Sequence, residues 1–206
     1  MRKTLVALIT AGLLSLLASV GTAATPQAVT ISTSRTSVVF GKSVTLSGKV
    51  SNSKAGENVS VVAEPFGTAT FAALATMQTV SGGHWSEVVK PTIETSYQAN
   101  WKGATSSTVS VKVRPLITLS LVNRATGSFS TKVSAARSFS GKFVLVQRLT
   151  STGVSTLKRV TLDSSSAASF RVRLHHGRSR LRLVMPTSQT APGYITGTSN
   201  VVTVLH

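Results

Sequence analysis

Apolar and polar residues alternate along most of the chain after residue 25, in short runs separated by Gly, Ser, Asn and Pro. Val109, Val111 and Val113, for example, share one face of an extended segment, while Ser110 and Lys112 lie on the other. A period of two residues is typical of half-buried strands. No segment has a convincing helix-length pattern, so the sequence predicts an all-β fold.

The alternating runs are dense. Strands are expected at 29–32, 43–50, 57–66, 84–91, 95–101 and 107–114, and again at 116–122, 128–136, 141–150, 156–163, 169–174, 180–186 and 200–205. The run 71–80 is rich in Ala and Leu, which also favour helix, but its neighbours favour a strand. Roughly seven strands in about 90 residues is the density of an immunoglobulin-like sandwich.

The pattern repeats, which predicts two tandem sandwich domains at 25–114 and 115–206. Each half ends in a similar strand, and each has an aromatic residue that opens an alternating run, Trp85 in the first and Phe170 in the second. Between the halves stands Arg114-Pro115. Proline fixes its own φ and restricts the preceding residue, so a short, stiff join is expected.

The first 24 residues have the pattern of a secretory signal peptide. Arg2 and Lys3 precede an apolar stretch at 5–17, and small residues follow around Ala23 and Ala24. The alternative is a retained membrane anchor, but the apolar stretch is shorter than the roughly 20 residues that a spanning helix needs. We expect cleavage after Ala23 or Ala24 and a secreted protein, either released or associated with a cell wall, with no transmembrane segment in the mature chain.

Charge is distributed unevenly. The chain has 22 Lys and Arg against five acidic residues, and it has no cysteine. Twelve of the basic residues lie in the second half, where Asp163 is the one acid. Such charge attracts polyanions, here an anionic wall polymer, acidic glycan, lipid head groups or extracellular nucleic acid without sequence specificity. The alternative is that the charge serves solubility alone.

The stretch FRVRLHHGRSRLRLVMP concentrates this charge. Eight basic residues of the second half are candidate anion contacts: Arg148, Lys158, Arg159, Arg171, Arg173, Arg178, Arg180 and Arg182. As a hairpin, the stretch would place arginines opposite one another, which is destabilising. In an immunoglobulin-like sandwich the fifth and sixth strands instead belong to different sheets. We therefore expect two separate basic surfaces.

One family has similar motifs. Gly83-His84-Trp85, Pro91 and Thr95-Ser96-Tyr97 resemble the Gly-x-Trp strand, proline corner and Thr-x-Tyr strand of Ig-like repeats in secreted bacterial proteins, especially from actinobacteria. The second half resembles a divergent companion, with Phe170 in place of the Trp and Leu181 near the Tyr position. The resemblance implies extracellular or wall-associated presentation and no catalytic residues.

Sites for chemistry are sparse. The acidic residues are spread along the sequence, and no G-x-S-x-G motif of a hydrolase is present. His175 and His176 are adjacent, so their side chains would point to opposite faces of a strand. The sequence predicts no catalytic residue, cofactor or metal. The aromatics Trp85, Tyr97, Trp101 and Tyr194 could form a sugar-stacking platform. Core positions are expected for Trp85 and Tyr97, and Trp101, before Lys102-Gly103, is the best candidate for an exposed contact.

Two functions follow from these patterns. The first is a non-catalytic structural or interaction protein of the cell envelope, retained by charge or by a protein partner. The second is a binding module for an acidic polymer, centred on the basic second half. An enzyme would need chemistry without a recognisable site.

Overall fold

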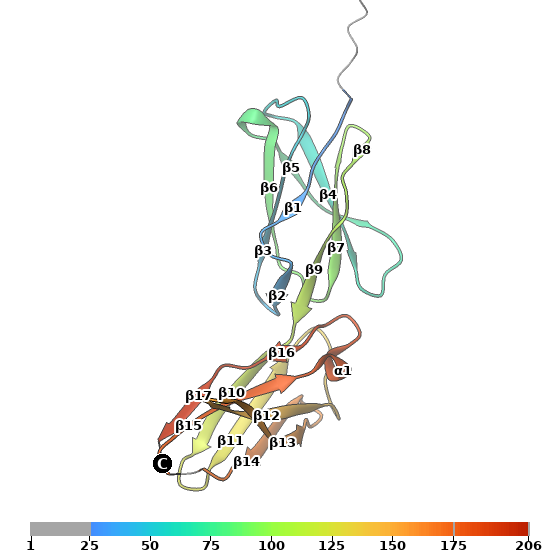
Figure 1. Ribbon diagram of the computed structural model, residues 1–206. Coiled ribbons are helices and arrows are strands. Elements are labelled where there is room, and N and C mark those ends of the chain that lie inside the picture. Colours follow the sequence, from blue (N-terminus) through green and yellow to red (C-terminus); the bar gives the residue numbers. More distant parts are fainter. Residues whose placement is uncertain (1–25, 175, 206) are drawn as a thin grey trace, which may run out of the picture.

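Strands dominate the computed structural model, which describes residues 26–174 and 176–205 (Figure 1). They are interrupted by a 3₁₀ turn, η1 (Ser81–Gly83), and one short helix, α1 (Thr187–Thr190). The expected signal peptide lies outside the described residues. The all-β prediction is confirmed.

Residues up to Arg114, here called the N-terminal half, form two sheets. One has the order β1-β3-β6, made of β1 (Ser32–Thr33), β3 (Val44–Lys49) and β6 (His84–Val89). The other has the order β2-β9-β7-β4-β5, made of β2 (Ser37–Val39), β9 (Val109–Arg114), β7 (Thr95–Trp101), β4 (Asn58–Pro65) and β5 (Ala72–Gln78), with β8 (Ala104–Thr105) beside β7.

Residues from Pro115 onward, the C-terminal half, also form two sheets. One has the order β10-β11-β14, made of β10 (Leu116–Asn123), β11 (Ser128–Ser134) and β14 (Ala167–Arg171). The other has the order β13-β12-β15-β16, made of β13 (Gly153–Thr161), β12 (Phe143–Thr150), β15 (Arg178–Met185) and β16 (Gly197–Thr198), with β17 (Val202–Leu205) also paired to β15.

The division of strands between sheets is that of an immunoglobulin-like sandwich in both halves. In one sheet β3 pairs with β6, and β11 pairs with β14 at the same place in the C-terminal half. In the other sheet β4 pairs with β7, and β12 pairs with β15. This is how strands B and E face strands C and F in immunoglobulin domains. The expected strand at 71–80 is present as β5. The pattern did not predict β2, a three-residue strand that pairs in parallel with β9.

Each core is built from the buried face of these strands. Alternation along β4 buries Val59, Val61 and Ala63. In the C-terminal half Phe129 of β11 stacks on Phe170 of β14, with ring centroids 5.8 Å apart. Both positions that the resemblance assigned to the core of the second half, Phe170 and Leu181, are buried.

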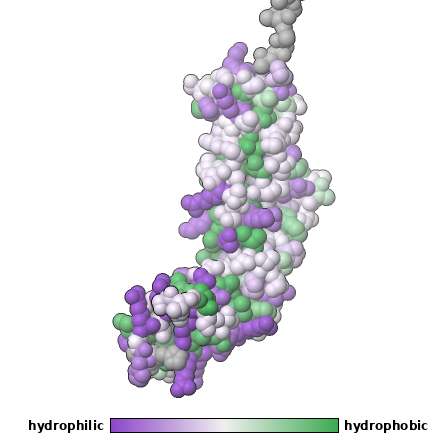
Figure 2. Space-filling view, viewed as in Figure 1, coloured by the Kyte–Doolittle hydropathy of each residue, from purple (hydrophilic) through white to green (hydrophobic). Residues whose placement is uncertain are grey.

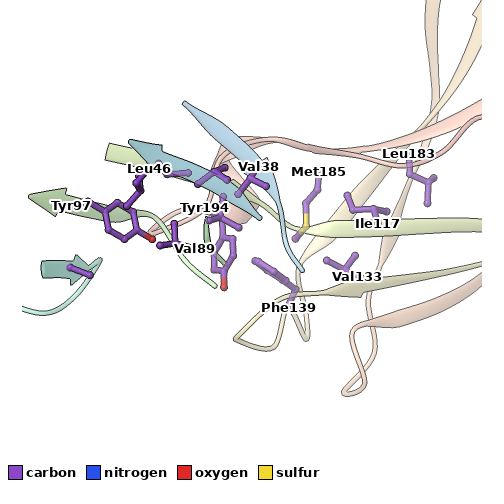
Figure 3. Packing of buried hydrophobic residues seen from close by; sticks show 14 of the residues in the cluster. Val38, Leu46, Val89, Tyr97, Ile117, Val133, Phe139, Leu183, Met185 and Tyr194 are labelled. Carbon is purple, nitrogen blue, oxygen red and sulfur yellow. The ribbon is translucent and has the colours of Figure 1, made fainter. Parts of the chain in front are cut away.

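The two halves meet end to end through the segment before β16 (Figure 1). The buried Tyr194 hydroxyl donates to Thr92 O of the N-terminal half at 2.7 Å, and accepts from Ala136 N of the C-terminal half at 3.0 Å. Figure 3 shows Tyr194 between core residues of the N-terminal half, such as Val89, and Phe139 of the C-terminal half. One side chain therefore connects the two sandwiches.

Backbone contacts hold the same joint. Glu94 N donates to Gly193 O, and Ile195 N donates to Val113 O, each at 3.0 Å. Gly193 has φ +79°, and a Cβ atom there would come within 2.6 Å of Ile93 Cδ1. Any side chain at this position would be strained by the positive φ, and the Ile93 side chain would have to shift to make room for it.

Replacing Tyr194 with Phe removes only the bridging hydroxyl. We expect the free energy of unfolding to fall by about 1–3 kcal/mol, because two backbone groups lose their partner. Residual dipolar couplings should also report a more variable orientation between the halves. Tyr97→Phe, in the core of one sandwich, is the matched control for orientation. Unchanged stability and couplings in Tyr194→Phe would show that the hydroxyl does not hold the joint.

Candidate anion-binding surface

The structure places six of the eight basic candidates in the sheet of β12, β13 and β15, with Arg171 at the end of β14 and Arg173 just beyond it. Phe170 belongs to β14, in the sheet with β11, whereas Leu181 belongs to β15, in the sheet with β12. The two runs are not hydrogen-bonded neighbours, so the sandwich interpretation of the arginine stretch is confirmed over the hairpin. Their apolar faces point into one core and their arginines lie on opposite outer sides.

The outer face of β15 holds three arginines in a row. Arg178, Arg180 and Arg182 alternate with Ser179, Leu181 and Leu183, which are buried. Beside this row, Arg182 Nε donates to Gln147 Oε1 of β12 at 3.0 Å. On β13, the Arg159 guanidinium lies 4.8 Å from the ring centroid of Phe143. We call Arg178, Arg180 and Arg182 the β15 row.

The side chains of Arg148 and Lys158 leave the backbone on the core-facing side of the same sheet. Their cross-strand partners, Leu181 and Val146 respectively, are buried on that side. Arg148 Nη2 donates to Arg173 O at 3.0 Å, and Lys158 Nζ donates to Arg171 O at 3.3 Å. Val172 N donates to Gly127 O, on the β11 side of β14. Because consecutive residues of a strand direct their backbone groups to opposite sides, the carbonyls of Arg171 and Arg173 lie on the side away from β11. The two cations therefore cover an open strand edge.

A second basic surface surrounds the end of β14. Arg171 and Arg173 are exposed there, and Arg173 lines a shallow cavity of about 280 Å³ together with Arg124. Arg124 was absent from the candidates. It lies in the turn between β10 and β11, and only the folding of that turn onto β14 brings it to this cavity.

None of these charges has a carboxylate partner in the parts of the chain that the structure describes. There, the one ion pair joins Lys102 and Glu57 in the N-terminal half. Asp163 Oδ1 accepts from Ala167 N, Ser165 N and the Ser165 hydroxyl, and these bonds lower the pKa of the carboxyl. Figure 2 shows hydrophilic residues gathered toward the free end of the C-terminal half.

The prediction for Trp101 was wrong. Its side chain is 3% exposed, because β7 runs on through this residue and alternation places Trp101 on the buried face with Tyr97 and Ala99. Trp101 Nε1 donates to Glu57 Oε2 at 3.2 Å, and the Lys102 ammonium lies 5.2 Å from the ring centroid. Trp101 is thus a core residue with its polar edge satisfied.

Glu57 is correspondingly not a freely solvated surface charge. Its carboxylate also accepts from Asn52 Nδ2 at 2.7 Å and from Lys102 Nζ. The bonds from Lys102, Asn52 and Trp101, in that order, lower its pKa from 4.5 to about 2. Three segments of the N-terminal half are therefore tied together by one carboxylate.

The other aromatics are buried too. Trp85 and Tyr97 occupy the core, as expected, and Tyr194 lies in the joint, all at 3% exposure or less. With Trp101 also buried, no sugar-stacking platform exists among these four residues. A cavity of about 580 Å³ in the N-terminal half is lined by residues that include Thr30, Ser32, Ser47, His84 and Trp85, and by no carboxylate.

Over residues 26–174 and 176–205, no group of three or more His, Asp or Glu side chains could hold a metal ion. His175 lies outside the described residues. Within the same ranges no helix is both long and apolar enough to cross a membrane.

Comparisons with known proteins give no family. No protein-family model matches the chain, and no curated protein matches it. Among solved structures, a tetra-tandem repeat from the extending region of a large adhesion protein is similar at 13% identity and TM-score 0.35, over 87% of this chain and 49% of that one. A marsupial T cell receptor is similar at 11% identity and TM-score 0.35, over 88% and 100%. This chain thus spans about half of the adhesion repeat structure.

Acid should weaken the N-terminal half through Glu57. Because folding lowers the Glu57 pKa from 4.5 to about 2, its contribution to stability is present above about pH 4.5 and is lost as pH falls toward 2. Urea unfolding at pH 6 and pH 3 should show a smaller acid-induced loss for Glu57→Gln than for wild type. Glu64→Gln, on the outer face of β4, should keep the wild-type loss; equal losses in all three proteins would contradict the assignment.

The two kinds of arginine should respond differently to truncation. Arg148→Ala removes the cover of the β14 edge and should cost about 1–3 kcal/mol of unfolding free energy. Arg180→Ala removes the same charge from an exposed position and should change stability by no more than about 0.5 kcal/mol. Denaturant titration of both variants measures the difference. Equal effects would mean that Arg148 has no structural role.

Proposed function

We propose that the protein is a non-catalytic interaction protein of the cell exterior, built of Ig-like modules and retained by electrostatic contact with an anionic partner. The observation that carries this proposal is the uncompensated charge of the C-terminal half. This half contains twelve Lys and Arg residues and one acid, Asp163, whose carboxylate accepts hydrogen bonds from residues of its own turn. Charge left unpaired in this way is available to a polyanion.

The joint between the halves supports a presentation role. Tyr194 and Gly193 lock two sandwiches end to end, which gives an extended unit with the basic half at one end (Figure 1). Such a unit can hold the N-terminal half away from a surface to which the C-terminal half binds.

The leader supports export. Arg2 and Lys3 followed by the apolar stretch at 5–17 have the order of a secretory signal, and the mature protein would begin near Thr25. The absence of cysteine means that the proposed extracellular protein has no disulfide, and its valine-rich hydrophobic packing and the Glu57 network supply stability in its place.

Catalysis is not part of the proposal. The cavity of about 580 Å³ has hydroxyls and His84 but no carboxylate to orient the imidazole as in a hydrolytic triad. Glu57 and Asp163 are committed to hydrogen bonds within the fold, whereas Glu64 and Glu94 line one cavity of about 280 Å³ whose lining contains no histidine.

Retention on an anionic surface tests the proposal. Mature protein should bind isolated wall fragments at about 50 mM salt and should lose at least about tenfold in affinity by about 200 mM, since bound counterions are released on association. A neutral polysaccharide matrix is the control. Salt-independent retention would contradict electrostatic binding and favour a protein partner, and turnover by the purified protein would contradict the non-catalytic assignment.

A further inference from the structure

The β15 row is more ordered than a dispersed basic surface. Arg178, Arg180 and Arg182 project from alternate positions of one strand, so neighbouring side chains emerge about 6.6 Å apart along a straight line. Strand β15 is paired with β12 on one side and with β16 and β17 on the other. The row is therefore fixed on an interior strand of its sheet.

The neighbours of the row reduce its freedom further. Gln147 Oε1 accepts from Arg182 Nε, and Arg159 on β13, which β12 separates from β15, lies over the ring of Phe143 on β12. Groups that are held in place before binding lose less entropy when a ligand arrives. By contrast, Arg171 ends an edge strand and Arg173 lies beyond it, so the second basic surface lacks this regular support.

The chemistry of the row indicates the class of ligand. Guanidinium groups bind phosphate oxygens in paired hydrogen bonds, and a straight row of them suits a chain with one negative charge per repeat. Bases bound without sequence preference stack on aromatic rings, and so do sugar rings. Both tryptophans and both tyrosines are buried, and Phe143 is covered by Arg159. Within residues 26–174 and 176–205, no exposed Trp or Tyr ring lies beside the row.

We infer that the β15 row, flanked by Arg159, binds an extended phosphodiester chain without bases, of the polyol phosphate type, which lies along β15. This inference rests on the proposed function and names its site and its ligand. Successive phosphates meet successive arginines, and the contacts are to the charged backbone of the polymer alone.

The test compares two triple variants with the same loss of charge. Arg178→Gln/Arg180→Gln/Arg182→Gln removes the β15 row, and Arg124→Gln/Arg171→Gln/Arg173→Gln removes the second basic surface. Affinity of each mature protein for poly(glycerol phosphate) is measured by calorimetry over a salt series. Circular dichroism and thermal unfolding verify the folds, and Arg180→Gln alone serves if the first triple variant does not fold.

Three contacts predict a wild-type slope of log affinity against log salt of about −2, or about 20-fold weakening between about 50 and 200 mM. The β15 variant should lose at least about tenfold in affinity and most of this slope, whereas Arg180→Gln should make the slope shallower by about 0.7, the contribution of one contact. The control triple variant should stay within about threefold of wild type.

Other outcomes separate the inference from the proposed function. Equal loss in both triple variants would overturn the row as a site but leave electrostatic retention standing. Tighter binding of wild type to oligo(dT) or to polygalacturonate would overturn the phosphate chain as ligand. No salt-dependent binding of wild type to any of the three polymers would overturn both.

Discussion

The packing of β14 against β15 across one core determines where the charge of this protein can act. Phe170 of β14 and Leu181 of β15 are both buried, although only residues 172–177 separate their strands in the sequence. Because the strands belong to opposite sheets, the residues between these apolar ones must point out on opposite sides. The arginines of a single sequence stretch are thereby divided into two surfaces with different support.

The same packing gives some cations a structural task. A sandwich whose sheets end in β13 and β14 leaves the edge of β14 open, and Arg148 and Lys158 reach across to its carbonyls. At the joint, Arg137 lies over the rings of Phe139 and Tyr194 and donates to the carbonyls of Thr190 and Ala191. Some basic residues of the C-terminal half thus stabilise the fold, whereas others are available to a ligand. A count of charges in the sequence does not separate the two groups.

Sequence patterns predicted the strands well where several alternating residues follow one another. They failed for β2, which is three residues long and too short to show a period, and for the side chain of Trp101, which was expected to be exposed because Lys102-Gly103 follows it. The alternation of Thr95, Tyr97 and Ala99 extends to Trp101, and that signal favoured a buried side chain. The local turn residues begin only after it.

The sequence by itself determined the fold class and the excess of positive charge over acid, because alternation and composition are properties of the chain. It also determined that the strands of Phe170 and Leu181 would separate, once a sandwich was assumed. The tertiary structure alone decided that Gln147 meets Arg182, that Glu57 meets Trp101 and that Tyr194 connects the halves. These pairs are 35 to 102 residues apart, and no local pattern encodes a contact over that separation.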